Sequence, residues 1–421
     1  MPITADEALQ SVLDNVAPLG MERLSIVAAL GRVLGEAIDS PRDIPGFANS
    51  AMDGYAVRAA DIAAAGEANP VRLAVIETVG AGVMPSRTVG KGEAVRTMTG
   101  APIAEGADAI VPVERTRGTA SIVEILAAAE VGAFVRPRGE DLKQGEHVIS
   151  AGKVLSAADS GMLASLNRAM VDVYRRPRVA IVATGDELVD IDQVPTGAQV
   201  VNSSAYALAA AITEAGGEPI ILKVARDSAQ EVRQRLTEAL AFDVVLSTGG
   251  VSVGQFDHVK QVLDDLGLKQ AFHGVAQKPG RPLKFGTISG KPVFGLPGNP
   301  VSTMVCFYLY VRPALRKMGG YRVLGLPRVA VRCAADIKIA NGLTEFVRVT
   351  LERRGDELLA APTGNQSSGV LSSLGRAHGL LIGPQEVNQL HAGDQVTVLL
   401  LEAGAAVDAE AFFEARRRQS I

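Results

Sequence analysis

Apolar strand patterns alternate with helical patterns through the middle of the chain, and this alternation limits the fold more than any other feature. The strand patterns cover residues 179–183, 220–224, 244–247 and 293–296, and the helical patterns cover 204–215, 229–240, 259–266 and 301–318. Gly216 and Gly217 provide a stop after the first helix, and Ser228 with Glu231 forms a capping box at the start of the second. Because strands that alternate with helices build a parallel sheet, residues 176–325 are predicted to form a central, doubly wound α/β domain.

Further regions flank this domain, as expected for a chain of 421 residues, which is longer than one hydrophobic core usually supports. A capping box formed by Thr4 and Glu7 opens a first helix, and helical patterns return at 28–34 and 156–166. They predict an elongated helical domain over 1–40 plus 142–175. A β-rich domain over 41–141 interrupts it, because short strand patterns there are separated by Gly and Pro turns.

Alternating polar and apolar runs follow Pro327 and cover 329–333, 346–351, 380–382 and 396–401. This period-two pattern predicts a small β-barrel or a sandwich over residues 326–404. Residues 405–421 are charged and helix-prone and are interpreted as a tail.

The charge balance argues against nucleic acid as a partner. Lys and Arg number 42 while Asp and Glu number 46, so the net charge of −4 leaves no basic surplus to neutralise phosphates. No basic segment followed by an apolar stretch opens the chain, and its apolar runs are shorter than the roughly 20 residues that cross a bilayer. The chain is therefore expected to be a cytoplasmic enzyme without a membrane span.

Cysteine and histidine usage limits the kind of metal site. Cys306 and Cys333 are isolated in the sequence, and the five histidines lack the spacing of a zinc site. A metal ion in this protein must therefore rely on oxygen ligands, as Mg²⁺ does.

Acidic, hydroxyl and glycine residues gather where the predicted parallel strands end, at the edge of an α/β sheet that binds ligands. Residues 184–188 follow the first strand, Asp227 follows the second, and a glycine-rich segment, 247–254, follows the third with Asp257 behind it. Glycine lets backbone amides approach an anion closely, so this segment is predicted to bind phosphate. Glu187, Asp227 and Asp257 are predicted to hold Mg²⁺ against that phosphate.

These signals also have simpler interpretations. A glycine-rich turn can merely connect a strand to a helix, and Asp227 can cap the helix that follows it. Neither a Walker A motif nor a dinucleotide fingerprint occurs in the chain, which excludes the P-loop and dinucleotide-binding dehydrogenase classes.

Stiff turns and polar loops add further candidates. Residues 278–284 hold three cations between Pro and Gly, and residues 297–300 form a second turn that leads into a helix. Fixed cations of this kind are predicted to face an anionic ligand. In the β-rich region the loops 49–56, 97–101 and 136–141 are candidates as well, although each alone reads as a turn with a capping acid.

Seven motifs occur along the chain, at 49–56, 98–101, 139–141, 184–188, 247–254, 278–280 and 295–302. Taken together and in this order, they resemble the molybdopterin molybdenumtransferase family, MoeA, which includes the gephyrin E domain. The resemblance spans nearly the whole chain and implies a four-domain protein whose C-terminal domain is a β-barrel. It also implies Mg²⁺-dependent insertion of molybdate into adenylylated molybdopterin with loss of AMP. The family resemblance implies a homodimer, with a molybdopterin adenylyltransferase as a further partner.

The resemblance assigns roles to individual residues. It implies catalytic roles for Asp53, Thr99, Asp141, Glu187 and Asp257. The metal ligands would be Glu187, Asp227 and Asp257. The substrate-binding residues would be Arg136, Thr184, Asp186, Ser247, Gly249, Gly250, Ser252, Gly254, Lys278, Arg281, Pro297 and Pro300. In the family's homodimers the β-rich domain of one subunit faces the α/β domain of the other, so Asp53 would meet Glu187 across chains. Gln255 and Arg281 depart from the family pattern, which commonly has an acid and Lys there.

Two other function classes compete with this interpretation. One is a gephyrin-like scaffold that keeps the fold and binds peptides, against which the retained acids argue. The other is a molybdopterin adenylyltransferase, which resembles the α/β domain alone and lacks both the 49–56 loop and the C-terminal β segments. Molybdate and tungstate are tetrahedral dianions of nearly equal size, and the sequence does not distinguish them.

Overall fold

The computed structural model describes residues 2–249, 258–355 and 357–401, which belong to two compact units. The larger unit comprises Met1–Gly35, Gly152–Leu155 and Met170–Ile421, and the smaller unit comprises Glu36–Ala151 and Ser156–Ala169. Each unit has its own β-sheet and its own core. None of the helices described in these ranges is long and apolar enough to cross a membrane.

A six-stranded sheet forms the centre of the larger unit, in the order β16-β13-β17-β21-β20-β18. The parallel strands are β16 (Glu218–Ile221), β13 (Arg178–Ala183), β17 (Val244–Thr248) and β21 (Lys291–Leu296). The antiparallel strands are β20 (Lys284–Ile288) and β18 (Lys269–His273). The predicted parallel α/β sheet is confirmed, and the two antiparallel strands extend it on one side.

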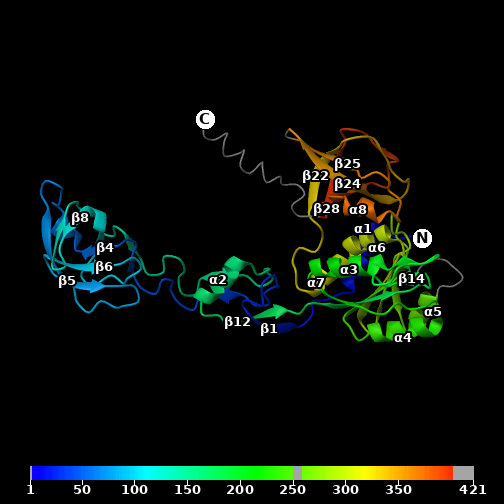
Figure 1. Ribbon diagram of the computed structural model, residues 1–421, viewed down its shortest axis with the longest axis horizontal. Helices are drawn as coiled ribbons and strands as arrows, with labels where there is room; N and C mark the ends of the chain where they lie inside the picture. Colours follow the sequence, from blue (N-terminus) through cyan, green and yellow to red (C-terminus); the bar gives the residue numbers. More distant parts are fainter. Residues whose placement is uncertain (1, 250–257, 356, 402–421) are drawn as a thin grey trace. The chain divides into compact units, whose positions relative to one another are not determined.

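Helices cover both faces of this sheet (Figure 1). On one face lie α1 (Ala5–Asp14), α3 (Ser203–Glu214), α6 (Pro300–Cys306), the π-helical turn η3 (Phe307–Val311) and α7 (Arg312–Met318). On the other face lie α4 (Ala229–Ala239) and α5 (His258–Asp265). Successive residues of β17 alternate between the two cores, with Leu246 in one and Val245 in the other. Burial of each such side chain stabilises the fold by about 1.5–3 kcal/mol, which explains the continuous apolar strand.

The helix predicted over 301–318 is present but irregular. Its middle turn is π-helical, and Pro313 is the second residue of α7, which begins at Arg312. Proline has no N–H to donate to the carbonyl four residues back, so the regular α-helical ladder cannot continue through this point.

The first helix is confirmed, and the second is not. Thr4 caps α1, and its hydroxyl oxygen accepts a hydrogen bond from the Glu7 amide. Residues 26–31 form turns instead of the predicted helix over 28–34, and Gly31 adopts a φ of +74°, which a helix does not allow. The neighbouring strands β1 (Met21–Ser25) and β12 (Met170–Tyr174) pair as an antiparallel ribbon.

The C-terminal part of the larger unit is a closed barrel. Its strands are β22 (Arg328–Cys333), β24 (Thr344–Arg354), β25 (Glu357–Pro362), β26 (Gly379–Gly383) and β28 (Gln395–Leu400). The pairing of β26 with both β24 and β28 closes the sheet, which confirms the barrel over the sandwich. The short strands β23 (Ile337–Lys338) and β27 (Gln389–Leu390) and the helix α8 (Leu371–Gly375) complete it. The predicted tail, 405–421, lies outside the described residues.

The smaller unit is β-rich, as predicted. Its main sheet contains β4 (Gly54–Val57), β5 (Val71–Val79), β6 (Glu93–Thr97), β7 (Ala109–Pro112), β8 (Thr116–Gly118) and β9 (Ile122–Ile125). Two short ribbons pair β2 (Ile38–Asp39) with β11 (His147–Ile149) and β3 (Asn49–Ser50) with β10 (Val135–Arg136). The helix α2 (Ala157–Ser165) confirms the predicted helical pattern and begins with a capping box formed by Ser156 and Asp159.

Candidate active site

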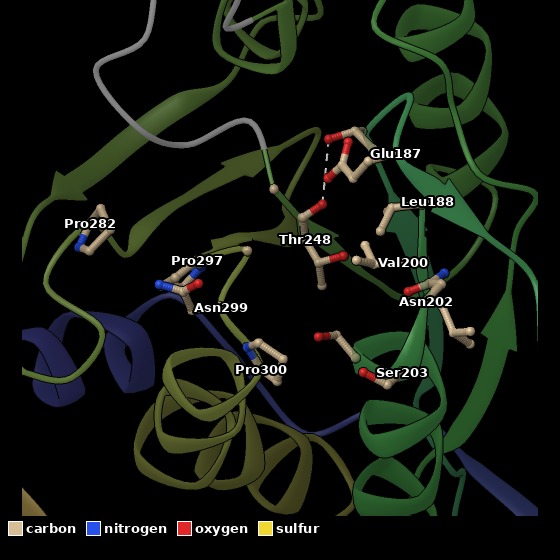
Figure 2. Close-up of a pocket in the computed structure, with 15 residues that line it drawn as sticks. Glu187, Leu188, Val200, Asn202, Ser203, Thr248, Pro282, Pro297, Asn299 and Pro300 are labelled. Atoms are coloured by element: carbon tan, nitrogen blue, oxygen red, sulfur yellow. Dashed lines mark hydrogen bonds between the residues drawn. The ribbon is translucent and has the colours of Figure 1, made fainter. Parts of the chain in front are cut away.

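A pocket of about 580 Å³ opens where β13, β17 and β21 end. In the sheet, β13 lies between β16 and β17. The chain therefore passes from β13 to β16 on one side and then crosses to β17 on the other side, which makes the end of β13 a topological switch point. Such a switch point leaves a crevice beyond the strand ends where ligands bind. The pocket is lined by Thr184, Glu187, Leu188, Val200, Val201, Asn202, Ser203, Ser204, Thr248, Gly249, Pro282, Pro297, Gly298, Asn299 and Pro300. Figure 2 shows Glu187, Thr248, Ser203 and Asn299 around the cavity.

Two helices begin at this pocket. The side-chain oxygen of Asn202 caps α3 by accepting a hydrogen bond of 3.3 Å from the Ala205 amide. Asn299 precedes Pro300 at the start of α6. First-turn amides of a helix have no partner within the helix, and together with the helix dipole they favour an anion. Two of these amides are already bonded here, Ala205 to Asn202 and Val301 to the Ser368 carbonyl, so the start of α3 is the better candidate. The pocket therefore suits a ligand that carries phosphate or another anionic group.

Backbone forms the floor of the pocket. The Thr184 amide donates a hydrogen bond of 3.1 Å to the Thr248 carbonyl, which joins the ends of β13 and β17. Gly249 follows with a φ of +86°, and a Cβ at this position would lie 2.9 Å from the Thr184 carbonyl oxygen. Only glycine lets the chain pass so close to β13, and the Gly249 amide donates a hydrogen bond of 3.3 Å to the Leu296 carbonyl, so this glycine has a structural role at the floor of the pocket.

Glu187 is the acid that lines the pocket. Gly185, with a φ of +146°, leaves room for the Glu187 carboxylate, because a Cβ on Gly185 would lie 2.5 Å from Glu187 Oε2. The Glu187 side chain is exposed to solvent and can accept a ligand or a cation. The strands β14 (Leu188–Val189) and β15 (Val200–Val201) form the adjacent wall.

Asp186 and Asp227 lie beside the pocket and do not line it. The Asp227 amide donates a hydrogen bond of 3.1 Å to Asp186 Oδ1, and both side chains are exposed. Ser228, not Asp227, caps α4. Among the residues that the structure describes, no group of three or more acids, Cys or His side chains could hold a metal ion.

Several candidates fall on the segment 250–257. Gly250, Ser252, Gly254, Gln255 and Asp257 lie outside the described residues. Ser247, just before this segment, is fully buried in β17, does not line the pocket, and its Oγ has no hydrogen-bond partner in the described ranges.

The cations of 278–284 have different environments. Lys278 Nζ lies 3.0 Å from Glu345 Oε1, and the Lys278 side chain is 52% exposed. Arg281 is exposed, and Pro282 beside it lines the pocket. Lys284 is buried and pairs with Asp264 at 3.3 Å, so the interpretation that all three cations face a ligand is wrong for Lys284.

Two of the candidate residues in the smaller unit, Asp53 and Thr99, are hydrogen-bonded to each other. Asp53 Oδ1 accepts hydrogen bonds of 2.7 Å from both the Thr99 amide and the Thr99 hydroxyl. These bonds lower the pKa of the Asp53 carboxyl, because they stabilise its charged form. Arg136 lies on β10 opposite Asn49, and the Asp141 amide donates to the Ile44 carbonyl.

Some pocket residues were not predicted. Asn202, Ser203 and Ser204 line the cavity, yet only the Asn-Ser-Ser run before the predicted helix over 204–215 could have indicated them. Such a run is a common helix start. It lines the pocket here because α3 begins directly after the strand β15.

Family models match three successive stretches of the chain. They describe a MoeA N-terminal region (domain I and II) over residues 3–167, a probable molybdopterin binding domain over 180–317, and a MoeA C-terminal region (domain IV) over 330–401.

Relatives match over nearly the full length. A molybdopterin molybdenumtransferase from a Nostoc species is 35% identical, covering 95% of this chain and 94% of its own. A molybdopterin molybdenumtransferase 2 from Mycobacterium tuberculosis is 36% identical, covering 89% of this chain and 93% of its own. A crystal structure of a molybdopterin biosynthesis MoeA protein from Pyrococcus horikoshii has a TM-score of 0.84 and 34% identity, covering 96% of this chain and 100% of that chain.

Proposed function

The chain belongs to the molybdopterin molybdenumtransferase family, and we propose from this premise that it inserts molybdate into adenylylated molybdopterin with release of AMP. The observation that carries the proposal is the strand-end pocket, where the Gly249 backbone and the starts of α3 and α6 converge. A pocket of about 580 Å³ lined by the start of α3, by hydroxyl side chains and by few charges fits a phosphorylated small molecule.

The residues of this chain bind and orient the substrate. The start of α3 holds the phosphate, and Ser203 and Thr248 add hydroxyl groups. Arg281 lies on the turn that contributes Pro282 to the pocket, and it attracts the molybdate dianion together with Lys278, which exchanges its ion pair with Glu345 for the substrate. Donors that are fixed before the reaction stabilise developing charge without reorganisation, so positioning supplies much of the catalysis.

Mg²⁺ is part of the proposal. Protein sites for Mg²⁺ often use only one or two carboxylates, with phosphate oxygens and water as the other ligands. Glu187 at the pocket offers one such carboxylate, and Asp257 and Asp227 are the further candidates. A bound Mg²⁺ would neutralise charge on the phosphate that is cleaved.

We also propose a cytoplasmic homodimer. This proposal rests on the family resemblance, which implies that the Asp53 loop of one subunit completes the pocket of the other. Asp53, Thr99, Arg136 and Asp141 would then act on the substrate bound by the partner subunit. A molybdopterin adenylyltransferase would supply the adenylylated substrate.

The transferase is favoured over the two rival functions. An adenylyltransferase needs only the α/β domain, whereas this chain also has the barrel and the β-rich unit and matches full-length transferases. A pure scaffold would bind partners without any turnover.

The decisive assay measures AMP released from adenylylated molybdopterin by the purified chain in the presence of molybdate and Mg²⁺. Wild-type protein should release AMP, and Asp53→Ala, Glu187→Ala and Asp257→Ala should not, while each variant keeps the wild-type mass in size-exclusion chromatography with light scattering. Absence of AMP release by folded wild-type protein would refute the transferase. Loss of the dimer in the variants would make the three acids structural. Tungstate in place of molybdate would establish the preferred oxyanion.

A further inference from the structure

Three buried polar side chains lie beneath the turn formed by residues 278–282, here called the cation turn. Gln277, Cys306 and Tyr310 are each 0% exposed, although each carries a polar group. Gln277 begins the strand β19 (Gln277–Lys278), Cys306 ends α6, and Tyr310 lies on the π-helical turn η3. Buried polar groups cost free energy unless they are paired, so their pairing is informative.

All three side chains pair with the cation turn or with each other. Gln277 Nε2 donates a hydrogen bond of 3.0 Å to the Pro279 carbonyl, and Cys306 Sγ donates one of 3.5 Å to the Gly280 carbonyl. Tyr310 Oη donates to Gln277 Oε1 and so fixes the amide of Gln277. Two successive carbonyls of the turn are therefore held from beneath.

The two ionisable donors of this network, Cys306 and Tyr310, keep their protons. Burial raises the pKa of the Cys306 thiol and the pKa of the Tyr310 hydroxyl above their ordinary values. Each group is consequently neutral and able to donate at physiological pH.

Gly280 lets the turn lie directly on this network. Its φ is +94°, and a Cβ would lie 2.5 Å from Cys306 Sγ and 2.8 Å from Gln277 Nε2. The turn is also tied on the barrel side, where Gln277 pairs with Thr344 and Lys278 with Glu345 of β24. The side chains of Lys278 and Arg281 are exposed, and the Lys278 ammonium also lies 3.0 Å from Glu345 Oε1.

We propose that Gln277 and Tyr310 are positioning residues of the reaction, which hold the cation turn so that Lys278 and Arg281 meet the anionic substrate. This inference rests on the proposed transferase function. The buried side chains beneath the turn would then influence substrate affinity, because the turn could move out of position if the Pro279 carbonyl lost its hydrogen bond. The π-helical turn places Tyr310 where the network needs it, and such turns recur at functional sites.

The test compares Tyr310→Phe and Gln277→Met with Val311→Ala. Tyr310→Phe removes one hydroxyl, and Gln277→Met removes both polar ends at similar size. Val311 is an equally buried, apolar neighbour on the same π-helical turn and serves as the matched control. Loss of one buried hydrogen bond should raise the KM for molybdate about tenfold in Tyr310→Phe, with kcat within about twofold of wild type. Gln277→Met should raise KM further, and Val311→Ala should lower only the melting temperature.

A second readout does not depend on turnover. Hydrogen–deuterium exchange of the Leu283 and Val275 amides, which donate to the Gly280 and Arg281 carbonyls of the turn, should be faster in Tyr310→Phe and Gln277→Met, and unchanged in Val311→Ala. Wild-type KM and wild-type exchange in Tyr310→Phe would overturn the proposal, even if Gln277→Met did not fold. If wild-type protein released no AMP, the transferase proposal would fail, while the exchange data would still show whether the network holds the turn.

Discussion

Asn299 Nδ2 donates a hydrogen bond of 3.0 Å to Ser368 Oγ, which joins the pocket to a loop of the C-terminal barrel. The Val301 amide donates a second hydrogen bond, of 3.1 Å, to the Ser368 carbonyl. Val301 also packs with Phe346 and Leu380 of the barrel. The barrel therefore supports the start of α6 and with it one wall of the pocket.

Ser368→Ala should weaken substrate binding more than it weakens the fold. Loss of this side-chain hydrogen bond should lower the free energy of unfolding by about 0.5–1.5 kcal/mol, and the KM for adenylylated molybdopterin should rise several-fold. Urea unfolding and AMP-release kinetics provide the two measurements. Ser372→Ala, an exposed serine of α8, is the control and should match wild type. A wild-type KM in Ser368→Ala would show that the barrel does not support the pocket.

Gly249→Ala should damage the pocket floor. Its Cβ would lie 2.9 Å from the Thr184 carbonyl oxygen, in addition to the strain of a φ of +86°. Gly342→Ala is the matched control, because Gly342 has a φ of +74° with nothing within 4 Å of its Cβ. We expect a cost of about 1 kcal/mol for the control and a larger cost, with loss of AMP release, for Gly249→Ala. Equal melting temperatures and activities would show that the contact with Thr184 is unimportant.

Local signals in the sequence were sufficient for much of the fold. The capping pairs Thr4–Glu7 and Ser228–Glu231 involve residues three apart, so they predict helix starts without knowledge of the rest of the chain. Strands buried on both faces read as continuous apolar runs, and the rule that ligands bind at strand ends places the pocket correctly.

Tertiary contacts decide what the sequence left open. Lys284 reads as a cation of an exposed turn, yet it lies in the antiparallel strand β20, where it is buried beside Asp264. Glu187 lines the pocket while Asp186 does not, and Asp186 Oδ1 instead accepts a hydrogen bond from the Asp227 amide. Residues 28–34 have helical spacing, but Gly31 and the pairing of Val33 with Val154 override it.

Thr99→Val should shift the pH dependence of the reaction. The hydrogen bonds from Thr99 lower the pKa of Asp53, so the Asp53 carboxylate stays ionised to a lower pH than an ordinary aspartate. The contribution of the ionised carboxylate is lost as pH falls through this lowered pKa. Removal of the hydroxyl should move the acid limb of the kcat/KM profile to higher pH, toward the ordinary aspartate value. Thr99→Ser keeps the hydroxyl and should restore the wild-type profile. An acid limb unmoved in Thr99→Val would show that Asp53 does not control it.

Removal of Mg²⁺ by a chelator should abolish AMP release, and added Mg²⁺ should restore it. Glu187→Gln keeps the size of the side chain and removes its charge, so the Mg²⁺ concentration for half-maximal rate should rise about tenfold or more. Glu218→Gln, at an exposed strand start outside the pocket, should behave as wild type. Full activity in a chelator would contradict the metal requirement.

Arg348 is a charged residue buried within the barrel, where it is only 1% exposed. Its guanidinium donates to Ser373 Oγ at 3.0 Å, to the Asn365 carbonyl at 3.3 Å and to the Ser367 carbonyl at 3.2 Å. Burial lowers the pKa of Arg348, and the neighbouring Glu345 charge opposes that shift. The cost of burial is thus offset mainly by hydrogen bonds to the loop that carries Ser368.

Arg348→Met should therefore destabilise the protein and loosen this loop together. Bonds to a charged donor are worth about 1.5–3 kcal/mol, and their loss leaves buried carbonyls unpaired, so we expect a loss of about 3 kcal/mol in urea unfolding. Arg348→Lys keeps the charge but not the fork of donors, and should recover only part of that loss. Arg332→Met, which removes an Arg that is 52% exposed on the same barrel, should cost less than about 1 kcal/mol. Because this loop holds Asn299 through Ser368, the KM for adenylylated molybdopterin should rise in Arg348→Lys as it does in Ser368→Ala. The rise in KM of the double variant should be less than the sum of the two single effects, because both substitutions weaken the contact between Ser368 and Asn299.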